Sequence, residues 1–394
     1  MRIALIYDAV YPWVKGGGEK YLHELAVQLR DLGHEPHVFG MHWWDGPDSM
    51  VREGIHYHAL CRATPLYQDS GRRSLMTALR FSVGVLWRYP RFRRMDFDLI
   101  NVVAFPSLAV PVFWLVHRLF ARRCPWFVTW FEVYGQTASR EHLGVWGPVA
   151  ALAERVYARL APANLCISPT TARRLQEFHQ VSPQQITVIP AGFERPAQMD
   201  GAVANKRRWN VVVAGRLVPD KRVDLVIRAW PHVVARLSEA QLHVIGDGPA
   251  RATCEQLAAG EGVPGAVCFH GQLADWHDVL RQIATAALLL QPSPREGQSL
   301  VVLEAMTLGT PVLAADGPHT AVGDFIGSDA AMPQALLPVD AGPQAWADRI
   351  VQLLTDDALA QRLAERGCVQ ARVLSWKEIM PRTLAFYQRL IQKP

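Results

Sequence analysis

The sequence predicts an α/β protein with two Rossmann-like domains that face a cleft. Apolar runs of strand length alternate with helix-length segments along most of the chain. The alternation stops over residues 191–208 and restarts at Trp209, which indicates two consecutive domains joined by a linker. The length of 394 residues also suits two domains rather than one.

The first half begins with a strand, a loop, a helix and a second strand. Residues 2–7 (RIALIY) are a continuous apolar run, typical of a parallel strand covered on both faces. Residues 20–33 place three leucines on one helical stripe and end at Gly33. Further strands are predicted at 34–40, 97–103, 125–131, 163–168 and 186–190, and helices at 148–161 and 168–179.

The second half repeats this order. Strand-length apolar runs are followed by glycine-containing turns and helical segments. We predict strands at 209–215, 241–245, 266–272, 287–293 and 311–316, and helices at 224–237, 300–309 and 375–391.

Cysteine usage and apolar run length exclude several classes of protein. The six cysteines are scattered without a CxxC pair, so a zinc site or a disulfide framework is not expected, and a reducing cytoplasm fits. The longest apolar run, 108–116, is far shorter than the ~18 residues that span a bilayer. The first strand is too short for the core of a signal peptide.

Two carboxylates stand out in the segment PREGQSLVVLEAM. Glu296 follows a predicted strand, and Glu304 lies about two turns into the helix after it. Ligands bind at this edge of a parallel sheet, and the helix N-terminus suits a phosphate. The two acids could therefore flank a diphosphate, with Glu304 on a ribose diol and Glu296 on a second sugar. Alternatively, Glu296 caps the helix and Glu304 is a solvated helix residue. The spacing fits both interpretations.

Other segments supply cations and glycines. Arg216 and Lys221 lie between a strand and a helix, where they suit a diphosphate or are ordinary surface charges. The loop KGGGEK is neither a dinucleotide nor a Walker motif, and it is either a phosphate-binding loop or a flexible turn. Gly246, in VIGDGP, fits a structural turn or an approach to a ligand.

Taken together, these segments resemble the retaining glycosyltransferases of family 4, which have the GT-B fold. The resemblance covers nearly the whole chain. It rests on GGGEKYLHELAVQLRDLGHEPHVF, IPAGFE, AGRLVPDKRVDLVIRA, VIGDGP, FHGQL and PSPREGQSLVVLEAMTLGTPVLAAD. It implies an N-terminal acceptor domain (1–195), a linker (196–208) and a nucleotide-sugar domain (209–375). It also implies a last helix (376–394) that crosses back to the first domain.

The resemblance also implies roles for individual residues. Arg216 and Lys221 match the cations that hold the donor diphosphate and stabilise the leaving nucleotide. Glu296 matches the acid near the donor sugar, and Glu304 the acid that binds ribose. The other implied donor-binding residues are Gly16, Gly17, Gly246, His270, Gly297, Gln298, Ser299, Leu300 and Val301.

One position departs from the family pattern. Where many members have a histidine that contacts the donor sugar, this chain has Phe131, followed by Glu132. Phenylalanine cannot hydrogen-bond a hydroxyl, so either the sugar is held differently or the activity is weak or absent. Ala191, in place of a common asparagine, is a smaller change.

The implied reaction moves a hexose from a nucleotide-diphosphate sugar to a saccharide or lipid-linked acceptor, with retention of configuration and without a metal or other cofactor. Residues 71–123 hold ten arginines and two acids among apolar residues. They form either helices that contact an anionic membrane or core helices with solvated arginines. The membrane interpretation predicts a cytoplasmic protein on the inner face of the cell membrane. Nucleic acid is not expected, since no reading motif is present.

Two alternatives remain beside a transferase. A non-catalytic, nucleotide-sugar-binding subunit of the same fold would explain Phe131, although the complete set of Arg216, Lys221, Glu296 and Glu304 argues against it. A nicotinamide-dependent oxidoreductase is a weaker alternative, because no G-x-G-x-x-G follows the first strand.

Overall fold

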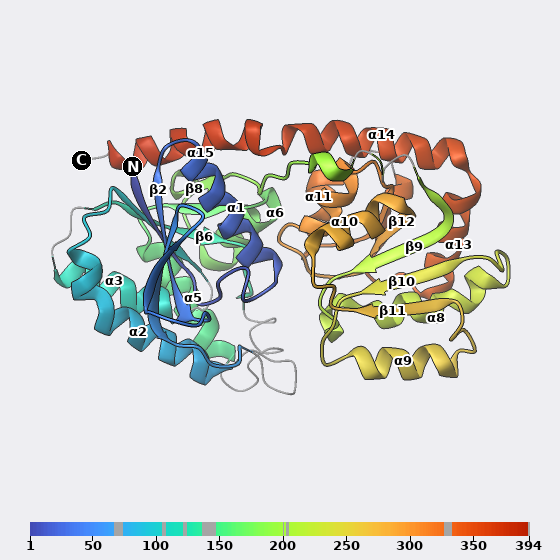
Figure 1. The fold of residues 1–394 in the computed structure, drawn as a ribbon, viewed down its shortest axis with the longest axis horizontal. Helices are drawn as coiled ribbons and strands as arrows, with labels where there is room; N and C mark the ends of the chain where they lie inside the picture. Colours follow the sequence, from blue (N-terminus) through green and yellow to red (C-terminus); the bar gives the residue numbers. More distant parts are fainter. Residues whose placement is uncertain are drawn as a thin grey trace. The chain divides into compact units, whose positions relative to one another are not determined.

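The computed structural model divides the chain into two compact α/β units (Figure 1). The first comprises Met1–Pro190 and Ile379–Pro394, and the second Ala191–Glu378. The structure describes residues 1–66, 74–104, 108–120, 124–135, 147–199, 201, 205–326 and 333–392. In those residues no helix has the length and apolar character needed to cross a membrane.

The first unit is built on an eight-stranded sheet in the order β3-β4-β2-β1-β5-β6-β7-β8. All neighbouring strands are parallel except the pair β3–β4. The strand order reverses between β1 and β5. The strands are β1 (Arg2–Ile6), β2 (Glu35–His42), β3 (Ser49–Arg52), β4 (Ile55–Arg62), β5 (Leu99–Val103), β6 (Trp126–Trp130), β7 (Asn164–Cys166) and β8 (Ile186–Val188).

The inner strands are buried along nearly their whole length, because helices cover both faces of this sheet. The helix after β7 begins after the N-cap residue Ser168, whose hydroxyl accepts a hydrogen bond from Thr171 N at 3.0 Å. The helices of this unit before its last are α1 (Gly17–Asp31), α2 (Leu75–Arg93), α3 (Ala109–Leu119), α5 (Gly147–Leu160) and α6 (Pro169–His179), with a 3₁₀ turn η2 (Pro183–Gln185).

The hairpin β3–β4 is an element that sequence periodicity did not predict. Its loop is the two residues Glu53 and Gly54, both with positive φ (52° and 74°), as a type I′ turn requires. Strand β4 then pairs in parallel with β2 and extends the sheet.

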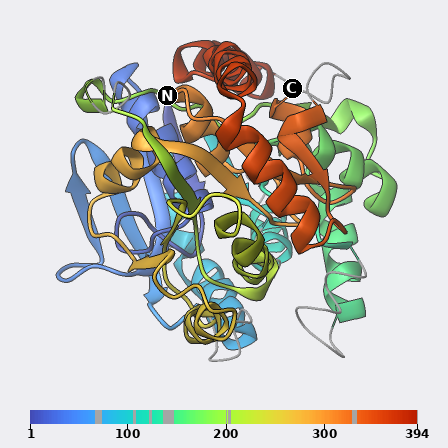
Figure 2. The same ribbon diagram turned by 90° about the vertical axis from the view of Figure 1, so that its right-hand side faces the viewer.

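The second unit is built on six parallel strands in the order β11-β10-β9-β12-β13-β14. The order reverses between β9 and β12, and helices lie on both sides of the sheet (Figure 2). The strands are β9 (Arg207–Ala214), β10 (Gln241–Ile245), β11 (Val267–Gly271), β12 (Ala286–Gln291), β13 (Val312–Asp316) and β14 (Leu336–Pro338).

Apolar helix faces close the core of the second unit, where Trp230 and Trp346 are almost fully buried. The helices are α8 (Val223–Val234), α9 (Arg251–Gly260), α10 (Trp276–Thr285), α11 (Leu300–Thr307), α12 (Val322–Ile326), α13 (Pro343–Thr355) and α14 (Asp357–Val373). The 3₁₀ turns are η3 (Ala197–Met199), η4 (Pro219–Lys221) and η5 (Pro333–Ala335).

The predicted linker, 196–208, is not a free connection between the units. The chain passes from the first unit to the second at 190/191, before that segment. Phe193 and Met199 are buried in the core of the second unit, and β9 already begins at Arg207. These two buried side chains anchor the segment to the second unit, although its sequence shows no apolar periodicity.

The last helix, α15 (Trp376–Ile391), returns the chain to the first unit. Its side chains Phe386 and Tyr387 pack on Phe127 of β6, with ring centroids 5.0 and 5.5 Å away. Arg389 donates to Thr187 Oγ1 of β8 at 2.8 Å. Phe386 and Tyr387 are buried, so this helix contributes to the core of the first unit.

Candidate functional site

The strongest cluster of predicted site residues lies at the reversal of strand order in the second unit. Arg216 and Lys221 follow β9, and Glu296 follows β12. These two strands are neighbours in the sheet, so their loops meet at the carboxyl edge. Lys221 Nζ forms an ion pair with Glu296 Oε1, bringing together two residues 75 positions apart.

Hydrogen bonds of both its side chain and its backbone fix the position of Glu296. Gln291, the last residue of β12, donates from Nε2 to Glu296 Oε1 at 2.5 Å. The backbone of Glu296 bonds the loop after β13: its N–H donates to His319 O at 3.1 Å, and its carbonyl accepts from Ala321 N at 2.7 Å. The side chain is 10% exposed. The alternative in which it caps α11 does not hold, because its hydrogen bonds go to Lys221 and Gln291.

Glu304 lies in the second turn of α11 and is buried. Its Oε1 accepts a hydrogen bond from the indole Nε1 of Trp276 at 3.0 Å. The alternative of a solvated helix residue is therefore wrong. A buried carboxylate with a fixed orientation is suited to binding a polar ligand group.

The segment from Gly297 to Val301 forms the approach to α11. Ser299 is the N-cap residue, and its side chain makes no capping hydrogen bond. Helix N–H groups in the first turn have no intrahelical acceptor and favour anions. Gln298 points elsewhere: its amide accepts from Ala191 N at 2.7 Å and donates to Ala191 O at 3.1 Å.

Gly246 serves the packing of two loops. A Cβ on this residue would lie 1.9 Å from the carbonyl oxygen of Gly215, and its φ is +132°. The loop after β10 can approach the loop that carries Arg216 only with glycine here. His270, at the end of β11, is exposed and lies 2.9 Å from His243 through their ring nitrogens.

In the first unit, Gly16 and Gly17 open helix α1, with Gly16 as its N-cap in an extended conformation. The loop before them follows β1, next to the reversal of strand order in that sheet. Glu19, in the first turn, is buried and accepts a hydrogen bond from the Tyr7 hydroxyl at 3.2 Å.

Phe131 packs against two tyrosines, Tyr7 after β1 and Tyr21 in α1. Its ring meets Tyr7 and Tyr21 edge to face, with centroids 6.1 and 5.3 Å away. A Cβ on Gly18 would lie 2.8 Å from Phe131 Cε2. Burial raises the pKa of Tyr21 well above its ordinary value, so its hydroxyl stays neutral. Glu132 lies 4.0 Å from the buried Arg174 guanidinium.

Sequence reasoning missed the residues that position these groups. Gln291 and Trp276 orient the two glutamates of the second unit. In the first unit, buried Glu154 accepts hydrogen bonds from Tyr134 N at 3.1 Å and Gly135 N at 2.9 Å, and so fixes the loop after β6. The polar end of strand 286–291 was a signal for Gln291. Nothing local marked Trp276 or Glu154.

Comparisons with known proteins agree with this architecture. The model of Glycosyltransferase Family 4 matches residues 15–195, and that of Glycosyl transferases group 1 matches residues 194–369. The MMP alpha-(1->4)-mannosyltransferase of Mycolicibacterium hassiacum is 25% identical, over 100% of this chain and 99% of that protein.

Solved structures share the fold. Sucrose-phosphate synthase from Thermosynechococcus elongatus superposes with a TM-score of 0.79 at 21% identity, over 99% of this chain and 98% of that one. HepE of Anabaena in complex with UDP-glucose has a TM-score of 0.72 at 18% identity, over 99% and 100% of the two chains.

Proposed function

Because the chain belongs to glycosyltransferase family 4, has the GT-B fold and is a hexosyltransferase, we propose that its donor is a nucleotide-diphosphate sugar. We further propose that the hexose is transferred with retention of configuration to a saccharide or lipid-linked acceptor. The predicted family and fold class are confirmed, and the donor, the stereochemistry and the acceptor are proposals.

The observation that carries this proposal is the ion pair of Lys221 with Glu296 at the reversal of strand order. Glu304, which follows in the sequence on α11, is buried. The arrangement offers a cation for a diphosphate and two fixed carboxylates for hydroxyl groups. A diphosphate that entered would compete with Glu296 for Lys221. The freed carboxylate could then accept hydrogen bonds from the donor sugar.

The nature of the donor has independent support. HepE, which shares the fold, was solved in complex with UDP-glucose. A ribose diol presents two adjacent hydroxyl donors, and Glu304, already oriented by Trp276, is an acceptor-only group. We therefore propose that Glu304 binds the ribose of the donor and Glu296 its hexose.

The proposed reaction exchanges one bond for another at the anomeric carbon. The acceptor hydroxyl oxygen bonds to that carbon on the face from which the nucleotide leaves. The carbon–oxygen bond to the diphosphate breaks, and the diphosphate takes the electron pair. A phosphate oxygen accepts the proton of the acceptor hydroxyl. Arg216 and Lys221 stabilise the charge on the leaving group, so we propose that neither a metal nor another cofactor takes part.

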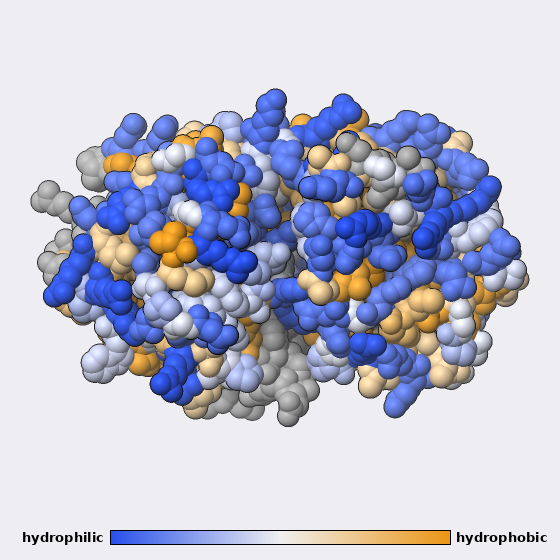
Figure 3. Space-filling model, viewed as in Figure 1, coloured by the Kyte–Doolittle hydropathy of each residue, from blue (hydrophilic) through white to orange (hydrophobic). Residues whose placement is uncertain are grey.

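The surface of α2 supports an acceptor at a membrane. One face of this helix is buried, and the opposite face exposes a stripe of apolar side chains: Leu75, Met76, Leu79, Val83, Leu86 and Trp87. Hydrophilic residues dominate the face drawn in Figure 3, where hydrophobic ones form small groups.

Exposed arginines lie beside the apolar stripe of α2: Arg80, Arg94 and Arg118, on or next to α2 and α3. Apolar side chains flanked by arginines suit an anionic bilayer. We propose that α2 holds the protein on the inner face of the cell membrane.

Phe131 favours a second candidate, a nucleotide-sugar-binding subunit without activity. Its ring, which packs on Tyr7 and Tyr21, has no group that could hydrogen-bond a sugar hydroxyl. The presence of both Arg216 and Lys221 favours an enzyme, because a subunit that only binds needs no charge stabilisation of a leaving group.

Calorimetry separates these candidates. UDP, GDP and ADP, with their hexose conjugates, are titrated into the wild type, Glu304→Ala and Phe131→His. Micromolar binding of one nucleotide that is lost in Glu304→Ala supports the donor site and names the base. Turnover by the wild type supports the enzyme, whereas turnover by Phe131→His alone supports the subunit. Absence of binding to every nucleotide overturns the proposal.

A further inference from the structure

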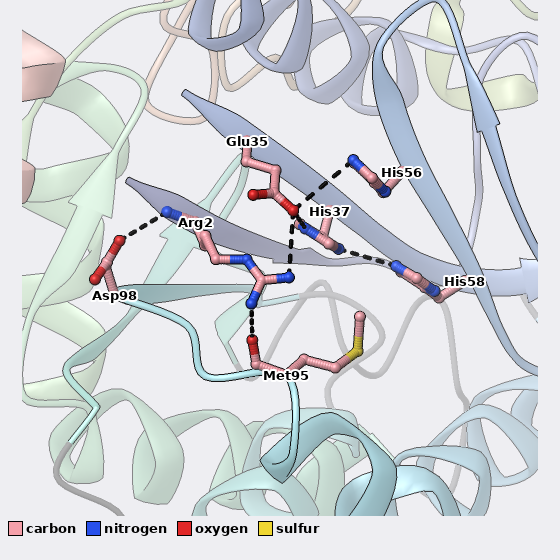
Figure 4. A network of polar contacts seen from close by, with 7 residues as sticks. All are labelled: Arg2, Glu35, His37, His56, His58, Met95 and Asp98. Carbon is pink, nitrogen blue, oxygen red and sulfur yellow. Dashed lines mark hydrogen bonds and ion pairs between the residues drawn. The ribbon is translucent and has the colours of Figure 1, made fainter. Parts of the chain in front are cut away.

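A group of histidines lies at the opposite edge of the first sheet from its ligand-binding edge. Glu35 and His37 are at the amino end of β2, and His56 is at the amino end of the parallel strand β4 (Figure 4). In parallel sheets of this kind, ligands bind at the carboxyl ends of the strands. The group therefore has no part in the transfer site proposed above.

Strand register brings these side chains together. Glu35 and His37 are two residues apart and so lie on one face of β2. His37 is paired directly with His56 across the two strands. The three potential ligand atoms all lie within 4.8 Å of one another. Glu35 Oε1 is 2.9 Å from His37 Nε2 and 3.8 Å from His56 Nε2.

These separations match a tetrahedral metal site. Zinc bonds nitrogen and oxygen ligands at about 2.0–2.2 Å, which places two tetrahedral ligand atoms roughly 3.3 Å apart. The observed 2.9 and 3.8 Å fall on either side of that value. The rings of His37 and His56 are stacked with centroids 4.3 Å apart, so a rotation of the half-exposed His56 would point both nitrogens at one ion.

A chain of hydrogen bonds reaches the Nδ1 atom of His37, the ring nitrogen that faces away from Glu35. Its Nδ1 lies 3.0 Å from His58 Nε2, and His58 Nδ1 lies 3.0 Å from Ser49 Oγ. With Nε2 of His37 protonated toward Glu35, the chain runs from Ser49 through His58 to His37. With Nε2 on a metal, the protons shift and His37 donates through Nδ1 to His58. A partner on the second ring nitrogen is the usual setting of a metal-binding histidine.

Arg2 gives the group a counter-charge. Its guanidinium lies 3.2 Å from Glu35 Oε1 and also donates to Met95 O. A cation bound by Glu35 would be repelled by this neighbour. Removing the Arg2 charge should therefore strengthen metal binding, although it also removes the ion pair of Arg2 with Glu35.

We propose that Glu35, His37 and His56 bind a divalent cation of the zinc type, with water as the fourth ligand. Two imidazoles and one carboxylate are donors that zinc accepts. The ion would join the starts of β2 and β4, and so hold the β3–β4 hairpin, which ends the sheet, to its interior.

The test uses the full-length chain, without a polyhistidine tag and freed of metal by chelation. Zn²⁺ is titrated by calorimetry and Co²⁺ by its visible absorption. One ion per chain is expected, with affinity at least 100-fold weaker in His56→Gln. His58→Gln should weaken binding about 10- to 100-fold, as loss of a partner behind a ligand does. Arg2→Met should tighten it. The exposed His232→Gln, in the second unit, is the matched control and should bind as the wild type does.

Three results would overturn the proposal. The first is the absence of stoichiometric Zn²⁺ or Co²⁺ binding by the folded wild type. The second is binding that persists in His56→Gln, a variant chosen because this side chain is 32% exposed and its loss spares the core. The third is unchanged affinity in Arg2→Met while circular dichroism shows a native fold.

Discussion

Lys221 and Glu296 form an ion pair that joins the loop after β9 to the loop after β12. The two strands are neighbours across the reversal of strand order, so the pair occupies the place where α/β sheets bind ligands. Lys221 is 33% exposed and Glu296 10% exposed. Because Lys221 is partly exposed, the pair is accessible to an anion.

Lys221→Met should lower turnover roughly 10²- to 10³-fold, the usual effect of losing one group that stabilises transition-state charge. Folding should be retained, because Gln291 still bonds Glu296. Initial rates with the donor identified by calorimetry test this, and the exposed Lys377→Met is the control. A rate within threefold of the wild type would show that Lys221 does not act on the leaving group.

Glu304→Gln should weaken nucleotide binding while leaving the fold intact. A hydrogen bond to a charged group contributes about 1.5–3 kcal/mol, or roughly 10- to 150-fold in affinity. The amide oxygen of glutamine can still accept from Trp276 Nε1, so melting temperature should hardly change. Trp276→Phe, which removes only the indole N–H, should weaken binding less than Glu304→Gln does. The reverse order would argue against a direct contact of Glu304 with the ribose.

Gln298→Leu should destabilise the second unit. The amide bonds both backbone groups of Ala191, and leucine would leave them unsatisfied in a buried place. Such a loss costs about 1–3 kcal/mol for each unsatisfied group. Urea unfolding measures the change, with Gln256→Leu on the exposed side of α9 as control. Equal stability of the two variants would mean that water replaces the amide.

Much of the fold followed from local patterns. The strand at 2–7, the helix at 168–179 and the last helix were predicted within a few residues of β1, α6 and α15. Continuous apolar runs and apolar helical stripes indicate which residues are buried, and this local pattern is enough to predict the type of element.

The remaining features depend on strand order, which local patterns do not contain. The contact of Lys221 with Glu296 arises only because β9 and β12 are adjacent. The group of Glu35, His37 and His56 arises because β4 returns beside β2 after a hairpin. The Glu53–Gly54 turn was the visible signal for that hairpin.

Gly18→Ala should destabilise the first unit, because the new methyl group would lie 2.8 Å from Phe131 Cε2. Overpacking of this kind costs about 1–3 kcal/mol. Phe131→Leu should relieve much of the cost in the double variant, and a double-mutant cycle by thermal unfolding measures the coupling. Gly260→Ala in α9, where a Cβ meets no atom within 4 Å, should instead stabilise slightly. Additive effects at Gly18 and Phe131 would contradict the contact.

Acidification should destabilise the first unit through its histidine group. Burial lowers the pKa of His37 to about 4, with His56 and Arg2 adding repulsion and Glu35 opposing the shift. Burial also lowers the pKa of His58 to about 3, with repulsion from His37, His56 and Arg91. The unfolded chain binds these protons below pH ~6.5, but the folded chain does not until near pH 4. The contribution of the two neutral histidines to the free energy of unfolding is therefore complete above pH ~6.5, and it is lost as the pH falls toward 4. The slope is about 1.4 kcal/mol per pH unit for each proton by which the two states differ.

Urea unfolding with a chelator present, at several pH values between 7.5 and 4.5, measures this slope. His37→Gln removes one titrating group and should flatten the dependence, whereas the exposed His232→Gln should leave it as in the wild type. Glu35 acts in the same direction, because its hydrogen bond to His37 and its pairing with Arg2 lower its pKa and its stabilisation is also lost on acidification. The flattening in His37→Gln should therefore be partial at the lowest pH. A slope equal to that of the wild type at every pH would mean that His37 takes up its proton in the folded state as readily as in the unfolded chain.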